Sequence, residues 1–294
     1  MNKKCFIDKS IELTKSSIDF IASMNLISTI YDENTTDCNE IEYLLLHSKL
    51  SDRKLLEMSN CKYIGIRAHN TDYVNKQITE KQNTVVKGLQ NQHSVNAVAE
   101  HTFSLILSVS KNLVQSHENV IKGKWRGKLR LNYELNNKKL GIIGNGQIGQ
   151  RVAELGKAFG MEILIAGKKS GIKSGEIAIE DVLKNSDVIS LHLSSRKEND
   201  QYINHDFLKL MKKNSILINT SRGSVLDYVA LESELKNNHL LGAGLDVFDT
   251  EPFEKSPLAD RPNVILTPHV AYMTNETLAK MNDELLANLN EFIN

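Results

Sequence analysis

Apolar and polar positions alternate along the first hundred residues in a way that is typical of strands and helices taking turns. Short apolar runs and helix-spaced apolar residues follow one another in KCFID, IDFIASM, LISTIYD, EYLLLHS, RKLLEM, KYIGIRA and NTVVKGL. Such an alternation predicts a parallel sheet with helices on its faces.

A second alternation begins near residue 139. Its apolar runs are KLGIIG, EILIAG, DVISLHL, SILINTS and AGLDVF, and helical patterns such as QIGQRVAELGKAFG and HDFLKLMKKNS lie between them. This pattern predicts a second doubly wound sheet. The expected fold class is therefore α/β, with two doubly wound parallel-sheet domains.

The segment between the two alternations predicts one long helix and a surface connection. From Ser94 to about Trp125 the chain has no Pro, no Gly before the last turn, and apolar residues at three-and-four spacing in VAEHTFSLILSV, so we expect one helix there. The following RGKLRLNYELNNKK is polar and aperiodic. We expect residues 1–95 to form the first domain, completed by the closing helix of residues 270–294, and residues 96–269 to form the second.

Proline placement marks the end of the second domain. All four prolines, Pro252, Pro257, Pro262 and Pro268, fall in EPFEKSPLADRPNVILTP. Because proline fixes φ and removes a donor, this segment is expected to be an extended connection. The last apolar pattern, NETLAKMNDELLANLNEFI, predicts a helix with Thr274 or Asn275 as its N-cap.

Composition narrows the class of partner. The 294 residues are 40% hydrophobic, which is enough for two cores, and Lys plus Arg equals Asp plus Glu at 36 each. We expect neither nucleic acid nor a membrane as partner, and a small molecule instead. No apolar run reaches eighteen residues and the start of the sequence has no signal-peptide pattern, so we expect a cytoplasmic protein.

The three cysteines and the metal-ligating residue types do not indicate a metal site. Cys5, Cys38 and Cys61 are odd in number and lack CxxC spacing, so we expect reduced, half-buried thiols. No cluster of His, Asp and Glu has ligand spacing, and no metal is expected.

A glycine-rich turn opens the second alternation. Gly144, Gly146 and Gly149 follow an apolar run and precede an amphipathic helix, with Gln147 and Ile148 between them. That order suits a dinucleotide: glycines allow a tight turn, close approach of a pyrophosphate and close packing, and the helix N-terminus supplies N–H groups. The alternative is an ordinary glycine-rich turn between strand and helix.

Polar residues also follow three later strands. LINTSRGSV leaves Asn219 and Arg222 at the end of one strand, GLDVFDTEP leaves Asp246 and then Glu251 beyond another, and His269 comes after VILTP. Open α/β sheets bind ligands outside the carboxyl ends of their strands. Taken singly, each residue could be a solvated loop residue or a structural one, but their joint appearance favours a site.

Together with the glycine turn, these clusters resemble the D-isomer-specific 2-hydroxyacid dehydrogenase family. The similarity runs from about Tyr63 to Thr277 and includes YIGIRAHNTDYVN, AVAEHTFSLIL and GKW. It implies a flavodoxin-like substrate domain, a Rossmann cofactor domain, a cleft between them, and a homodimer to which the helix from Ser94 contributes.

The resemblance implies a catalytic trio of Arg222, Glu251 and His269, and the chemistry fits these residue types. Reduction of a 2-oxo acid needs a hydride at C2, a proton for the developing alkoxide and a cation for the carboxylate. Arginine supplies a planar fork, histidine transfers a proton near neutral pH, and a carboxylate on the other ring nitrogen favours imidazolium.

The remaining expected contacts fall into two groups, and those of His192, Asp246 and the loop residues 68–70 are implied by the resemblance. For the cofactor they are Gly144, Gly146, Gln147, Ile148, Gly149, Gly167, Lys168, Lys169, Ser170, His192, Thr220 and Asp246, with Asp246 near the nicotinamide. For the substrate they are Arg222 and the loop residues Ala68, His69 and Asn70, where Asn70 could adopt a left-handed conformation. Arg67 and His69 could also read a polar or anionic substrate side chain.

The stretch AGKKS bears on cofactor choice. Gly167 occupies the position where an acidic residue would bind the ribose hydroxyls of NAD. Without that acid, Lys168, Lys169 and Ser170 could bind a 2′-phosphate, so NADP is the expected cofactor. The alternative is a pair of solvated lysines with NAD bound.

Two functions of different classes follow. The first is an oxidoreductase that converts a 2-oxo acid into its D-2-hydroxy acid, reversibly, with a nicotinamide cofactor. The second is a non-catalytic, dinucleotide-sensing protein like the co-repressors that share the fold. Formate or phosphite oxidation is less favoured, since formate oxidation needs no histidine poised by a carboxylate such as Glu251.

Overall fold

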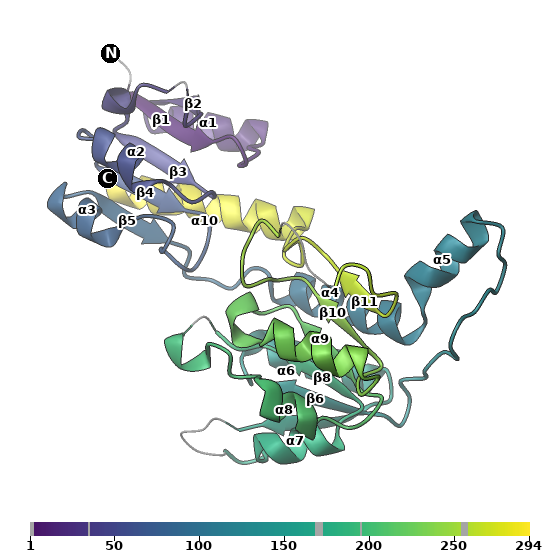
Figure 1. Cartoon of the computed structure of the whole chain (residues 1–294). Coiled ribbons are helices and arrows are strands. Elements are labelled where there is room, and N and C mark those ends of the chain that lie inside the picture. The colour runs from purple at the N-terminus through teal and green to yellow at the C-terminus, as the bar shows by residue number, and fades with distance from the viewer. Residues whose placement is uncertain (1–2, 35, 168–172, 195, 254–257) are drawn as a thin grey trace. The chain divides into compact units, whose positions relative to one another are not determined.

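The computed structural model describes residues 3–34, 36–167, 173–194, 196–253 and 258–294 (Figure 1). The chain divides into two compact units. Unit 1 comprises Met1–His93 and Thr274–Asn294, and unit 2 comprises Ser94–Met273. Each is built on one parallel sheet, so the expected α/β class with two doubly wound sheets is confirmed.

Unit 1 has a five-stranded parallel sheet in the order β2-β1-β3-β4-β5. This is the flavodoxin-like order that places the switch point between β1 and β3. The strands are β1 Lys3–Asp8, β2 Leu26–Tyr31, β3 Tyr43–Leu46, β4 Tyr63–Ile66 and β5 Val85–Gly88. The helices are α1 Lys15–Ser23, η1 Cys38–Glu40, α2 Asp52–Glu57, α3 Lys76–Lys81 and α10 Asn275–Ile293.

The continuous apolar runs of unit 1 arise because its strands are buried on both faces. Along β3, Leu44 and Leu46 pack in one cluster with Leu55 of α2, whereas Tyr43 and Leu45 pack in the other. That second cluster also holds Ile21 of α1 together with Leu285, Leu286 and Leu289 of α10. The last helix of the chain therefore completes the first core.

Unit 2 has a six-stranded parallel sheet in the order β11-β10-β9-β8-β6-β7. The strands are β6 Lys139–Ile143, β7 Glu162–Ala166, β8 Val188–Leu191, β9 Ile216–Asn219, β10 Gly242–Leu245 and β11 Val264–Leu266. The helices are α4 Val95–Ser110, α5 Leu113–Ile121, α6 Gln147–Ala158, α7 Ile179–Asn185, η2 Lys197–Asn199, α8 His205–Leu210, η3 Gly223–Val225 and α9 Tyr228–Lys236. The strand order reverses at β6, which puts the switch point between β6 and β8.

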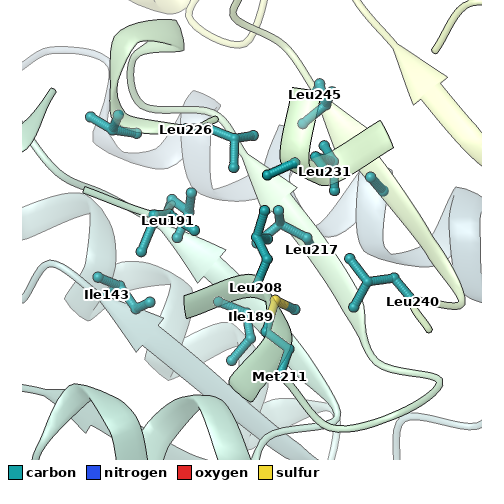
Figure 2. Close-up of a cluster of buried hydrophobic side chains, with 14 of the residues drawn as sticks. Ile143, Ile189, Leu191, Leu208, Met211, Leu217, Leu226, Leu231, Leu240 and Leu245 are labelled. Atoms are coloured by element: carbon teal, nitrogen blue, oxygen red, sulfur yellow. The ribbon is translucent and has the colours of Figure 1, made fainter. Parts of the chain in front are cut away.

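Helices cover both faces of this sheet as well. On one face, Leu208 of α8 and Leu231 of α9 lie against Leu217 of β9 (Figure 2). On the other face, Ile106 of α4 and Val152 of α6 pack with Val188, Ile216 and Ile218.

The helix expected from Ser94 to Trp125 is interrupted, and that prediction was wrong. α4 ends at Ser110 and α5 starts at Leu113, because Asn112 adopts a left-handed conformation with φ of 51°. Asparagine tolerates this region better than other non-glycine residues. Its side-chain amide donates to the carbonyl of Arg130 at 3.1 Å and to Asn132 Oδ1 at 2.9 Å, so the following connection fixes the break.

Several smaller expectations have clear outcomes. Thr274 is the N-cap of α10, since its hydroxyl accepts from the backbone N–H of Thr277 at 3.2 Å.

The cysteines are fully buried rather than half-buried, and burial raises the pKa of Cys5 and of Cys61 to about 12. The described part of the proline-rich segment holds no helix. In the described ranges, no helix is long and apolar enough to cross a bilayer.

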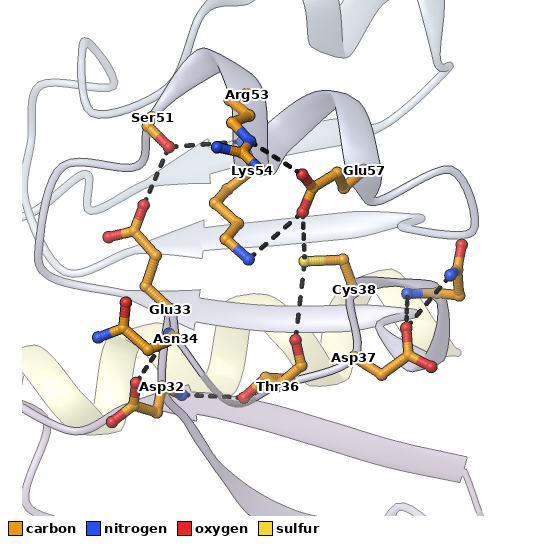
Figure 3. Close-up of polar contacts among 11 residues, drawn as sticks. Asp32, Glu33, Asn34, Thr36, Asp37, Cys38, Ser51, Arg53, Lys54 and Glu57 are labelled. Atoms are coloured by element: carbon orange, nitrogen blue, oxygen red, sulfur yellow. Dashed lines mark hydrogen bonds and ion pairs between the residues drawn. The ribbon is translucent and has the colours of Figure 1, made fainter.

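Polar side chains hold the loop after β2 against α2 (Figure 3). The Ser51 hydroxyl, which caps α2, donates to Glu33 Oε1 at 2.9 Å. Glu57, at the other end of α2, pairs with Lys54 at 3.3 Å and accepts from the Cys38 thiol at 3.7 Å. The thiol of Cys38 thus serves as a packed donor between η1 and α2.

Asp8 organises the carboxyl edge of the sheet in unit 1. Its carboxylate is 4% exposed and accepts backbone N–H groups of Ser10 at 2.9 Å, His47 at 3.1 Å and Ser48 at 2.7 Å. Burial alone would raise the pKa of Asp8, but these hydrogen bonds lower it to about 2. The ionised carboxylate therefore links the loops after β1 and β3.

We expect Asp8→Asn to remove about 2 kcal/mol of stability at neutral pH, because the pKa of Asp8 falls from 3.8 to about 2 on folding. The folded pKa is the lower one, so this stability is complete above pH 4 and is lost as the pH falls towards 2. Denaturant unfolding at pH 7 and at pH 3 measures both effects. The exposed Asp19→Asn is the matched control, and an equal loss in the two variants would contradict the assignment.

Candidate functional site

The glycine turn of unit 2 lies at the sheet's switch point, directly after β6. Gly144 has φ of +111°, and a Cβ there would lie 2.3 Å from the carbonyl oxygen of His192, which follows β8. A Cβ on Gly149 would lie 2.1 Å from the carbonyl oxygen of Gly144. These two glycines are therefore required by the fold of the turn itself.

Gly146 differs from its two neighbours in the motif. Among the described residues, a Cβ on Gly146 would meet no heavy atom within 4 Å, so no described contact requires glycine there. Gly146 is also the N-cap of α6, and no side chain in the described part of the chain caps that helix. The first turn, which includes Gln147 and Ile148, thus presents backbone N–H groups toward open space, which suits an anion such as a pyrophosphate.

His192 borders the same turn. Its backbone N–H donates to the carbonyl of Ile143 at 2.7 Å, and its Nε2 lies 2.9 Å from the Ser190 hydroxyl. Burial lowers the pKa of His192 to about 4, so the ring is neutral at neutral pH. Beside the glycine turn, a neutral ring contributes shape rather than charge.

The loop after β7 returns to the glycine turn. Gly167 donates its N–H to the carbonyl of Ile177 at 2.9 Å, whereas Lys168, Lys169 and Ser170 lie outside the described residues. The side-chain amide of Asn145 donates to Glu176 Oε1 at 3.0 Å. The sequence gives no motif for this contact, since Glu176 is 31 residues from Asn145.

His269 and Glu251 form a hydrogen-bonded pair at the ends of β11 and β10. Nδ1 of His269 lies 2.6 Å from Glu251 Oε2, and Glu251 Oε1 accepts from the N–H of Phe248 at 2.9 Å. The two side chains are 40% and 36% exposed. The carboxylate fixes the tautomer and the plane of the ring, so Nε2 is the nitrogen left for chemistry.

Arg222 lies at the end of β9, next to the strand that precedes Glu251. Asn219 shapes its loop by accepting from the N–H of Ser221 at 3.0 Å and donating to the carbonyl of Arg222 at 2.9 Å. A Cβ on Gly223 would lie 1.8 Å from the carbonyl oxygen of Phe248, so the Arg222 loop packs closely on the loop that carries Glu251. Arg222 itself is exposed.

Asp246 is a buried carboxylate beneath this edge. It is 0% exposed and accepts from the Thr267 hydroxyl at 2.5 Å and from the N–H groups of Val270 at 3.0 Å and Ala271 at 2.9 Å. Burial would raise the pKa of Asp246, but hydrogen bonds from His101, Thr267 and these N–H groups lower it. All of these hydrogen-bond donors are other residues of the same chain.

Thr220 occupies a similar supporting position. It is 7% exposed, and its hydroxyl lies 2.9 Å from the Thr102 hydroxyl of α4.

In the described residues of both units, no group of three or more His, Cys, Asp and Glu is arranged to hold a metal ion.

The predicted substrate loop follows β4 in unit 1. The carbonyl of Ala68 accepts from the N–H of Leu89 at 2.9 Å, and His69 is exposed. Asn70 does not adopt the left-handed conformation expected for it; instead its Oδ1 accepts from the N–H of Asp72 at 2.9 Å. An Asx-type hydrogen bond therefore shapes the loop.

Arg67 serves the fold of unit 1. It is 4% exposed, and its guanidinium donates to Asn282 Oδ1 of α10 at 3.2 Å and to the carbonyl of Ser10 at 3.2 Å. The expectation that Arg67 reads a substrate side chain does not fit this burial, because the guanidinium is committed to joining α10 to the strand ends.

Comparisons with known proteins agree with this architecture. The family model described as "D-isomer specific 2-hydroxyacid dehydrogenase, NAD binding domain" matches residues 103–271. The chain is 39% identical to a glyoxylate reductase of Thermococcus litoralis over 210 residues, which cover 67% of this chain and 63% of that enzyme. The match thus spans less than two thirds of that relative's length.

Two solved structures resemble the whole chain. An acyclic imino acid reductase in complex with NADPH and D-Arg is 30% identical, with a TM-score of 0.82 over 99% of this chain and 96% of that one. A D-lactate dehydrogenase of Aquifex aeolicus, complexed with NAD and lactic acid, is 31% identical, with a TM-score of 0.78 over 98% and 95%. With the family model covering more than half of its residues, the chain belongs to the D-isomer-specific 2-hydroxyacid dehydrogenase family.

Proposed function

We propose that this protein reduces a small 2-oxo acid to its D-2-hydroxy acid, reversibly, with a nicotinamide cofactor. The observation that carries the proposal is the 2.6 Å contact between His269 and Glu251 beside the Arg222 loop. Relatives named glyoxylate reductase and D-lactate dehydrogenase support a small 2-oxo acid. In this proposal unit 2, expected as residues 96–269, binds the cofactor, and unit 1 contributes substrate contacts at Ala68, His69 and Asn70.

The residues of unit 2 suit a dinucleotide. With respect to the described residues, Gly146 leaves open space in front of the uncapped start of α6, where the pyrophosphate would be held by backbone N–H groups. His192 would line the same turn, and Thr220 and Asp246 would support the nicotinamide end. The cofactor, when bound, supplies the hydride for C2 of the substrate.

The chain's own residues perform the remaining steps. Arg222 binds the substrate carboxylate and polarises the 2-oxo group with its planar fork. The imidazolium form of His269, oriented by Glu251, donates the Nε2 proton to the oxygen that becomes the hydroxyl. In the oxidation direction the neutral ring accepts that proton, so one histidine serves both directions.

An assay of a panel of 2-oxo acids with NADPH and NADH tests the proposal. We expect turnover with at least one of glyoxylate, pyruvate and hydroxypyruvate, read as loss of reduced-nicotinamide absorbance. Tight cofactor binding without turnover on any of them would contradict the enzyme and favour the dinucleotide-sensing alternative. The cytoplasmic location stays a prediction from the sequence.

We expect His269→Ala to lower kcat by about 10²- to 10⁴-fold, because it removes the proton donor. The Kd of the reduced cofactor, measured by fluorescence titration, should change little. His205→Ala is the matched control, since His205 is exposed at the start of α8. Equal losses of kcat and cofactor affinity would indicate a structural histidine instead.

We propose NADPH as the preferred cofactor. The support is the absence of an acidic residue at Gly167 and the presence of Lys168, Lys169 and Ser170 directly after it. One similar structure holds NADPH and another holds NAD, so family membership leaves both cofactors open.

The ratio of kcat/KM for NADPH over NADH should therefore exceed one. Gly167→Asp should invert this ratio, because a carboxylate repels a 2′-phosphate and binds the ribose hydroxyls of NADH. Steady-state kinetics with each cofactor at a fixed oxo acid concentration gives the ratio. A wild-type ratio below one would refute the preference and leave the proposed reaction intact.

We also propose a homodimer formed through α5. This helix projects away from the sheet of unit 2 (Figure 1) and exposes apolar side chains. The exposed fractions are 58% for Leu113, 57% for Val120, 70% for Ile121 and 72% for Trp125 just beyond the helix. Exposed apolar side chains gathered on one helix are typical of a protein–protein interface.

We expect light scattering after size exclusion to give twice the chain mass of 33.1 kDa, and Ile121→Asp to yield monomer because it buries a charge in the contact. Val229→Asp is the control, since Val229 is an apolar residue on α9, outside α5, with 80% exposure. A wild type that elutes as monomer at micromolar concentration would overturn the proposal.

A further inference from the structure

Two consecutive residues of α4 contact the strand ends that form the candidate site. The Thr102 hydroxyl donates to the carbonyl of Val98 at 2.8 Å, so its oxygen accepts from the hydroxyl of Thr220 at 2.9 Å. His101 places Nε2 3.0 Å from the Thr267 hydroxyl and 3.4 Å from Asp246 Oδ1. The helix therefore supports the loops after β9, β10 and β11 together.

In the contact between His101 and Thr267, the available protons show which group is the donor. Asp246 is ionised, since its hydrogen bonds lower its pKa despite burial, and an ionised carboxylate only accepts. The single hydroxyl proton of Thr267 points to Asp246 at 2.5 Å. Thr267 can therefore only accept from His101, so Nε2 of His101 carries a proton whether the ring is neutral or charged.

The same carboxylate holds the backbone on both sides of His269. Thr267 lies two residues before it, and Val270 and Ala271 follow it, and all three donate to Asp246. The N–H of His269 donates to the carbonyl of Asp246 at 2.8 Å. Within this frame His269 has φ of +55°, a conformation that a non-glycine residue keeps only when its surroundings enforce it.

We propose that His101 is a positioning residue for His269, acting through Thr267 and Asp246. This inference rests on the proposed function, because it assigns His269 the proton transfer. Loss of the Nε2 donor leaves the Thr267 oxygen without its partner and Asp246 without its donor from α4. The backbone around His269 then relaxes, and the ring loses its alignment with Glu251.

The test compares two replacements at one position. His101→Leu removes the donor, whereas His101→Gln supplies an amide N–H at a similar distance along the side chain. We expect Leu to lower kcat about 10-fold, because small misplacements of catalytic groups are costly, and Gln to restore most of it. The Kd of NADPH should stay within about twofold in both variants.

Ser104→Ala on the same helix is the control, since Ser104 is exposed and bonds only to the carbonyl of Glu100 among the described contacts. Thermal unfolding of every variant separates positioning from loss of fold. An unchanged kcat in His101→Leu, or equal damage from Leu and Gln, would overturn the proposal.

A second readout does not depend on turnover. The ring C–H resonances of His269, assigned by their absence in His269→Ala, should shift at fixed pH in His101→Leu and return towards wild type in His101→Gln. If the wild type reduces no oxo acid, the proposed function fails, while this spectrum still decides whether His101 orients His269. Identical His269 resonances in all variants would exclude the positioning role.

Discussion

The buried carboxylate of Asp246 is the interaction on which the rest of the candidate site depends. A charge with 0% exposure is several kcal/mol too costly to keep unless donors surround it. Here the donors come from the loop after β11 and from α4, so the ionised carboxylate is stabilised while that loop keeps its donors in place. Because the buried charge of Asp246 needs these donors, it restricts the conformation of the backbone that carries His269.

Parallel strands explain why residues far apart in sequence meet at this edge, and why sequence alone could predict them. Each of Arg222, Glu251 and His269 follows a strand, and the three strands β9, β10 and β11 are neighbours in the sheet. Polar residues after apolar runs, together with the family resemblance, therefore sufficed to expect these residues at one edge of the sheet, and their catalytic roles stay a prediction. The contact between Glu251 and His269 needs no long-range information beyond the order of the strands.

Other features could not be predicted because their causes lie in distant parts of the chain. Periodicity continues across Asn112, and the break there depends on acceptors that the later connection supplies at Arg130 and Asn132. Arg67 resembles a loop residue in sequence, yet its partner Asn282 is 215 residues away. His101 has the spacing of any helical residue, and only the fold brings Thr267 to it.

Both units bury an ionised carboxylate that accepts backbone N–H groups, but the consequences differ. Asp8 is the last residue of β1 in unit 1, accepts backbone N–H groups of two loops and is ionised, much as Asp246 is in unit 2. The donors to Asp8 are backbone groups and one serine, so that network can only stabilise a fold. In unit 2 the loop that the carboxylate fixes also carries a histidine bound to Glu251. The constraint on shape is common to both sheets, and the proposed chemistry belongs to the sheet where that constraint acts on a group that can exchange a proton.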